Sequence, residues 1–122
     1  MTPLSKGGVF CELRPIDLIK QCLQPFAEIC GSSSFPQDFI LGCTAPVGDL
    51  GQNIARAALL HAGESGTSGV QINRFDLSGL DAVGLAAAKI AAGLQRSIIA
   101  GGLDLRSRLA RTEDSGPWTD DP

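Results

Sequence analysis

The 122-residue sequence has few of the residues on which metal, redox or nucleic-acid chemistry depends. Its single histidine excludes a metal site built on several histidines, and we expect no metal and no cofactor. The four cysteines, Cys11, Cys22, Cys30 and Cys43, include no CxxC pair, so we interpret them as reduced thiols in the core of a cytoplasmic protein. With 10 basic and 13 acidic residues, the formal charge of −3 argues against a non-specific nucleic-acid binder.

Long apolar segments are missing as well. The most apolar region, residues 80–103, is interrupted by Asp81, Lys89, Gln95 and Arg96, so we expect no transmembrane helix and no membrane partner. Residues 1–9 contain no apolar stretch after a basic start, and we therefore expect no signal peptide. Aromatic residues make up 5% of the chain against 15 glycines, which favours tight turns and close packing of small side chains.

Helical and strand patterns alternate along what we expect to be one domain over residues 1–122. The spacing of apolar residues predicts helices at 15–30, 51–62 and 78–94, and strands at 38–43, 70–74 and 97–100. Pro25 should kink the first helix or split it near Gln24, and Gly63 should end the second. The alternation predicts an α/β fold with a mainly parallel sheet and helices on both faces. Residues 112–122 are expected to be loosely ordered, because the last ten hold four acids and no base.

The most informative turn is residues 73–79 (NRFDLSG), which joins an expected strand to an expected helix. Ligands of parallel α/β folds gather at such junctions. Asp76 lies just before the helix, where it acts either as an N-cap, which we favour, or as a catalytic carboxylate. Ser78 is a second candidate nucleophile, but no base accompanies it. His61 is expected on a separate helix, as a packed or surface residue rather than a catalyst.

Two further features leave alternatives open. Gly101-Gly102 either forms a tight turn after the last strand or lies close to a substrate. Arg106, Arg108 and Arg111 form a small basic cluster, which we interpret as a solvated loop in preference to a site for the phosphates of a ligand.

Several stretches in order resemble the thiolase family, the acetyl-CoA acetyltransferases and 3-ketoacyl-CoA thiolases. Residues 72–93 (INRFDLSGLDAVGLAAAKIAAG) resemble its nucleophile turn and the helix that follows. The resemblance implies the N-terminal portion of a thiolase fold, an ancestral acyl transfer between CoA thioesters in fatty-acid or ketone-body metabolism, and acyl-CoA as a ligand. The other matching stretches are RPIDL (14–18), GQNIARAALLHAG (51–63), IIAGGLDLRSR (98–108) and DSGPWTDDP (114–122).

The departures from the family pattern bear on activity. A cysteine follows the Asn-Arg-aromatic triplet in the family, and Asp76 stands at that position here. Leu77 replaces a small residue, and residues 104–106 read Asp-Leu-Arg where the family has Glu-Ser-Met. A carboxylate is a far weaker nucleophile toward a thioester than a thiolate. The sequence also stops before the family's second half, which supplies its histidine and second cysteine. We therefore expect a truncated thiolase-like protein that is inactive alone.

Other functions remain open beside this one. The chain could be a non-catalytic partner that docks on a full-length thiolase-type subunit, or an acyl-CoA-binding module. Self-association is also expected. The resemblance implies that residues 69–75 lie at a dimer seam, and Leu80, Val83, Ala87 and Ile90 should form an apolar helix face that is partly uncovered.

Overall fold

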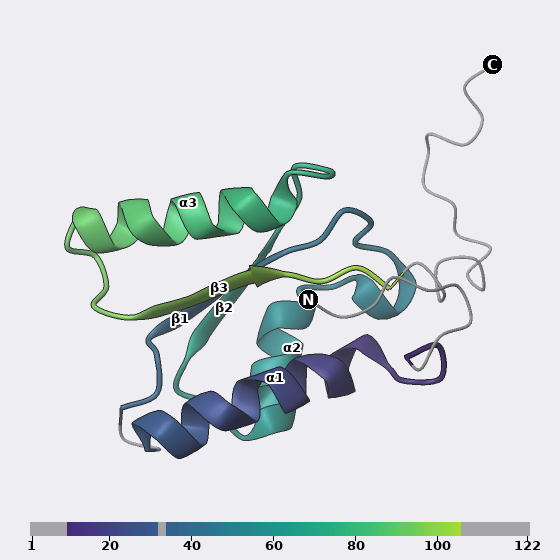
Figure 1. The fold of residues 1–122 in the computed structure, drawn as a ribbon, viewed down its shortest axis with the longest axis horizontal. Helices are drawn as coiled ribbons and strands as arrows, with labels where there is room; N and C mark the ends of the chain where they lie inside the picture. Colours follow the sequence, from purple (N-terminus) through teal and green to yellow (C-terminus); the bar gives the residue numbers. More distant parts are fainter. Residues whose placement is uncertain (1–9, 32–33, 106–122) are drawn as a thin grey trace.

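The structure is a computed structural model that describes residues 10–31 and 34–105. Its three strands form a parallel sheet in the order β2-β1-β3. Helix α3 covers one face of this sheet, and α1 and α2 cover the other (Figure 1). The predicted α/β architecture is therefore confirmed. In chain order the elements are α1 (Pro15–Cys30), β1 (Asp38–Gly42), the 3-10 turn η1 (Gly48–Leu50), α2 (Ile54–Ala62), β2 (Ser68–Ile72), α3 (Ser78–Ala91) and β3 (Ile98–Gly102).

The core lies on both sides of the central strand, all five residues of which are buried. Phe39 and Leu41 point to the larger cluster, against α1, α2 and η1. Ile40 points to the opposite face and packs against Ala82 and Ala86 of α3. A strand buried on both faces reads as a continuous apolar run, which is why residues 38–43 were recognisable as a strand.

Small residues let α3 begin directly on the sheet. A Cβ atom at Gly42 would lie 2.3 Å from the backbone C and O of Ser78. A Cβ atom at Gly102 would lie 3.1 Å from the Cα of Gly79. Glycine at the ends of β1 and β3 therefore allows the first turn of α3 to approach the backbone of both strands. This contact fixes the position of residues 73–77, which precede α3, relative to the sheet.

The expected element boundaries need several corrections. Helix α1 continues through Pro25, so the split expected near Gln24 is wrong. Pro25 is exposed, whereas Ile19 and Leu23, which lie in the turns before it, are buried and pack the helix against the core. Helix α2 begins at Ile54 rather than at residue 51, because Gln52 and Asn53 have φ values of 56° and 58°, which no α-helix accommodates. Gly63 ends α2 in the left-handed conformation, with φ 89°, as predicted.

The expectations for the later strands also shift. Strand β2 ends at Ile72, two residues earlier than expected, and α3 ends at Ala91. Gly101 and Gly102 belong to β3 and pair with Leu41 and Gly42. The interpretation of these glycines as a tight turn is therefore wrong: their backbones continue the parallel ladder beyond the apolar run.

The four cysteines form no disulfide, as expected, but their burial differs from the prediction. Cys43 is buried, Cys11 and Cys30 are half-buried, and Cys22 is exposed, so only Cys43 is a core thiol. Within residues 10–31 and 34–105, no helix has both the length and the apolarity to cross a membrane. The arginine cluster at 106–111 and the acidic end at 112–122 lie outside the described residues.

Candidate functional site

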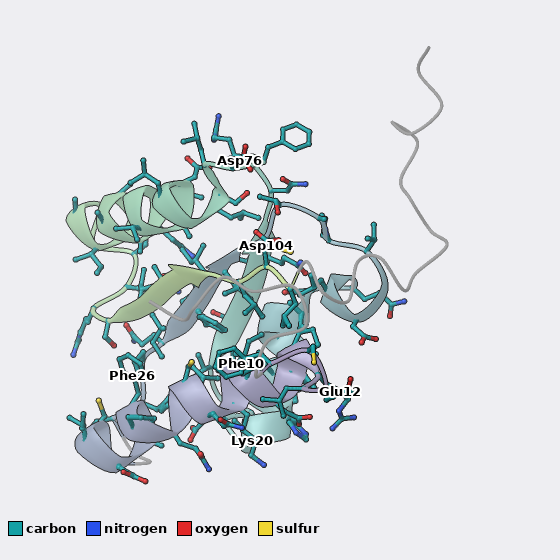
Figure 2. All side chains as sticks on the ribbon, turned by 45° about the vertical axis from the view of Figure 1, so that its right-hand side comes forward. Phe10, Glu12, Lys20, Phe26, Asp76 and Asp104 are labelled. Atoms are coloured by element: carbon teal, nitrogen blue, oxygen red, sulfur yellow. The ribbon has the colours of Figure 1, made fainter. Side chains whose placement is uncertain are left out.

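The candidate site is the loop between β2 and α3, at the carboxyl end of the sheet. Residues 73–77 leave β2 and turn into the first residue of α3, Ser78. Figure 2 shows Asp76 on the outside of the molecule at the start of α3, with Asp104 lying below it toward the sheet. The sequence-based prediction of a functional junction thus falls on a strand-to-helix turn of the expected kind.

Short-range hydrogen bonds hold this turn in an unusual conformation. Phe75 has φ 47°, in the left-handed region that bulky residues rarely adopt. Its N–H donates to Oδ1 of Asn73 at 2.8 Å. The N–H groups of Leu77 and Ser78 donate to the carbonyl oxygens of Arg74 and Phe75 at 3.1 and 3.0 Å. These bonds close two successive tight loops and bring the chain round into α3.

Asp76 does not cap α3, so the favoured interpretation of this residue is wrong. The N-cap position is occupied by Leu77, and no side chain caps the helix. Asp76 stands one residue earlier, where a carboxylate is not placed to accept from the first free N–H groups of the helix. Its side chain is exposed and has no hydrogen-bond or ion-pair partner among residues 10–31 and 34–105. The carboxylate therefore faces solvent at an uncapped helix start.

The second candidate, Ser78, has a structural role that the sequence did not reveal. It is 2% exposed. Its Oγ accepts the N–H of Arg74 at 2.8 Å and donates to the carbonyl oxygen of Phe75 at 2.5 Å, with the carbonyl oxygen of Cys43 at 3.4 Å. A hydroxyl that is buried and satisfied in this way is not available for attack on a substrate.

His61 lies on α2, a separate helix from α3, as the sequence predicted. Helix α2 covers the opposite face of the sheet from α3. Its Nε2 is 2.9 Å from Oδ1 of Asp17, a contact that ties α2 to α1. The Arg14 guanidinium also bonds Asp17, and chiefly for this reason the pKa of Asp17 is lowered, with His61 adding to the effect. His61 is therefore not brought near Asp76.

The one buried thiol lies beneath the turn. Cys43 follows β1, and its Sγ is 3.6 Å from Oδ1 of Asp104. Burial raises the pKa of this thiol to about 11, with the Asp104 carboxylate adding to the shift. Both carboxylate oxygens of Asp104 also accept the N–H of Thr44, at 3.0 and 3.3 Å, which joins the ends of β1 and β3. The sequence marked Asp104 only as a departure from a family pattern; its contacts depend on the fold.

Another contact of the turn lies on the surface. Nε of Arg74 is 2.9 Å from Oδ2 of Asp81, one turn into α3. Because the Arg74 side chain is 65% exposed, this ion pair contributes at most about 1 kcal/mol. No group of three or more metal-ligating side chains occurs within the part of the chain that the structure describes.

Comparison with known proteins agrees with this geometry. A family model described as thiolase, N-terminal domain, matches residues 1–117. The 3-oxoadipyl-CoA/3-oxo-5,6-dehydrosuberyl-CoA thiolase of Escherichia coli K12 is 49% identical over 113 residues, which cover 88% of this chain and 28% of that protein. The beta-ketoadipyl-CoA thiolase of Pseudomonas knackmussii is 37% identical over 111 residues, with the same two coverages of 88% and 28%.

The fold has a solved counterpart in the crystal structure of the Bacillus anthracis acetyl-CoA acetyltransferase. The TM-score is 0.71 at 29% identity, over 83% of this chain and 26% of that one. This chain thus spans little more than a quarter of the length of its relatives. The resemblance seen in the sequence is confirmed over nearly all of its length: the chain belongs to the thiolase family, whose N-terminal domain it matches.

Proposed function

We propose that this chain is a thiolase-type domain for CoA thioesters that does not itself form an acyl-enzyme at the β2–α3 turn. The proposal is supported by Asp76, an exposed carboxylate at the position that the resemblance to thiolases assigns to the nucleophilic cysteine. Attack of a carboxylate on a thioester would give a mixed anhydride and release a thiolate. The carboxylate is a much poorer nucleophile than a thiolate, and the mixed anhydride is the more reactive acyl compound.

No neighbouring group of the described residues replaces the missing thiol. Cys43 is buried and its pKa is raised to about 11, so it stays protonated near neutral pH. The hydroxyl of Ser78 is engaged within the turn. His61 lies on the other face of the sheet and cannot serve as their base. These three placements support a scaffold without its own acylation chemistry.

The names of the relatives support a ligand class. Their names describe thiolases of ketoadipyl-CoA and oxoadipyl-CoA and an acetyl-CoA acetyltransferase. We therefore propose acyl-CoA as the ligand of this chain, in lipid or fatty-acid metabolism of the cytoplasm. A non-catalytic module that binds acyl-CoA retains this ligand without the acyl transfer.

The exposed face of α3 supports a partner as well. Leu80, Val83 and Ile90 are 72%, 51% and 44% exposed. Together with Ala87 they are spaced three, four and three residues apart, which is the spacing of a seam between two packed helices. A second copy of this chain presents the same seam, and we propose self-association through α3 in preference to docking on a longer thiolase-type subunit.

The sheet edge adds a second surface for the same contact. Strand β2 lies at the edge of the sheet. Its residues, SGVQI, include no charge and no proline, the features that commonly protect an edge strand from pairing with another chain. The unprotected edge and the α3 seam both support the proposed association of two copies of this chain.

Incubation of the purified chain with acetyl-CoA and acetoacetyl-CoA tests the proposed lack of acylation. Intact mass should show no acyl adduct, and the release of free CoA should equal that of the Asp76→Asn variant, which has the same shape without the negative charge. An acyl group located by peptide mapping on Asp76 or on any cysteine, together with repeated turnover, would contradict the proposal. Equilibrium dialysis with acetyl-CoA measures the binding that the module alternative requires.

A further inference from the structure

Ser78 is the side chain that joins the turn to the rest of the molecule. Its hydroxyl contacts the N–H of Arg74, the carbonyl oxygen of Phe75 and the carbonyl oxygen of Cys43. These groups belong to the turn and to the residue that follows β1. The hydroxyl uses both its donor and its acceptor capacity inside the protein. One buried atom therefore holds the incoming chain, the first residue of α3 and the carboxyl end of the central strand together.

The conformation of Phe75 requires such a support. A non-glycine residue in the left-handed region persists only where the surrounding structure holds it. Phe75 is 62% exposed. Two polar contacts hold its backbone: its N–H donates to Oδ1 of Asn73, and its carbonyl oxygen accepts from the hydroxyl of Ser78. From below, the close approach of Gly42 to the backbone of Ser78 fixes the position of this hydroxyl.

The side chain of residue 76 takes no part in this support. Its side chain is exposed, and within the described residues no hydrogen bond or ion pair holds it. We propose that Ser78 is the positioning residue that presents the side chain of position 76 at the uncapped amino end of α3, whichever residue stands there. This inference rests on the proposed function only in treating position 76 as the reactive position of the family.

Thiol chemistry at position 76 makes the positioning measurable. In the Asp76→Cys variant, the new thiol should react with iodoacetamide faster at pH 7 than Cys22, which is exposed on α1 of the same molecule. The amino end of a helix favours a thiolate. Adding Ser78→Ala should lower the ratio of the two alkylation rates about two- to fivefold, since the thiol is no longer held at the helix end. The pKa of the new thiol, read from the pH dependence of its alkylation rate, should rise correspondingly.

Thr67→Val in the same Asp76→Cys background is the matched control. Thr67 is 5% exposed and donates to the carbonyl oxygen of Pro36 at 2.7 Å, so this change also removes a buried hydroxyl, at the opposite end of β2. It should leave the alkylation ratio unchanged. If Ser78→Ala leaves the ratio unchanged, or if Thr67→Val lowers it equally, Ser78 is only a packing residue and the inference is wrong.

Hydrogen exchange in the unsubstituted chain gives a test that does not depend on how the variants fold. The Arg74 amide, which donates to Ser78, should exchange at least tenfold more slowly than in an unstructured peptide. Unprotected exchange at Arg74 would overturn the inference. Neither measurement uses acyl-CoA. An acyl adduct on the unsubstituted chain would therefore overturn the proposed function while leaving the positioning role of Ser78 intact.

Discussion

The close approach of α3 to the central strand predicts that Gly42→Ala destabilises the protein strongly. The added Cβ atom would lie 2.3 Å from the backbone C and O of Ser78, where ordinary contacts begin at 3.4 Å. The start of α3 must therefore move by about 1 Å, because the obstructing atoms are backbone and cannot rotate away. Overpacking of this kind typically costs about 1–3 kcal/mol, and here it also strains the contact of Ser78 with Cys43.

Urea unfolding followed by far-UV circular dichroism measures this loss as a lower transition midpoint with an unchanged slope. Gly84→Ala is the matched control, because Gly84 lies within α3 and a Cβ atom there meets nothing within 4 Å. Alanine in a helix interior is favoured over glycine by about 0.5–1 kcal/mol, so this variant should gain stability. The reasoning fails if Gly42→Ala unfolds at the same midpoint as the parent chain, or if both substitutions change stability in the same direction.

Three other predictions concern charge, association and the nucleophile position. Burial would raise the pKa of Asp38, but hydrogen bonds from Lys89 and Ser68 outweigh burial and lower that pKa. The ionised Asp38 carboxylate therefore contributes fully to stability above about pH 4, and this contribution is lost as the pH falls further. Asp38→Asn should weaken the fall in the free energy of unfolding below about pH 4. An unchanged fall would exclude the Asp38–Lys89 pair as its source. In light scattering at micromolar concentration the chain should be a dimer or larger, and Leu80→Glu should yield monomer. Leu60→Glu, the same substitution at an exposed leucine of α2, should not; a monomeric parent chain rules out self-association. Asp76→Cys should change the free energy of unfolding by less than about 0.5 kcal/mol, because Asp76 is not a cap. The same variant should restore no thiolase turnover, since one thiol without its base performs at most a single acyl transfer. Repeated turnover would contradict the proposal that this chain lacks acyl-transfer chemistry of its own.

The sequence by itself determined the order and type of the elements. Apolar runs and helical spacing depend on neighbours a few residues away, and the chain carries those signals clearly in residues 38–43 and 78–91. Gly63 was recognisable as a helix end because a left-handed residue after a helix is a local requirement that glycine meets. The turn at 73–79 was located in the same way, from its place between a strand and a helix.

Tertiary structure decided where α2 begins and what the residues of the turn do. The N–H of Ile54 donates to the side chain of Gln71, which in turn donates to the carbonyl oxygen of Leu50, so a residue of β2 sets the start of α2 from 17 positions away. Asp76 could not be assigned from its position before a helix, because α3 begins one residue later than a cap at Asp76 requires. Ser78 became a buried support because the end of β1 packs against it. Contacts between distant segments leave no mark in a local pattern, and the contact of Ser78 with Cys43 and those of Asp104 with Cys43 and Thr44 are of this kind.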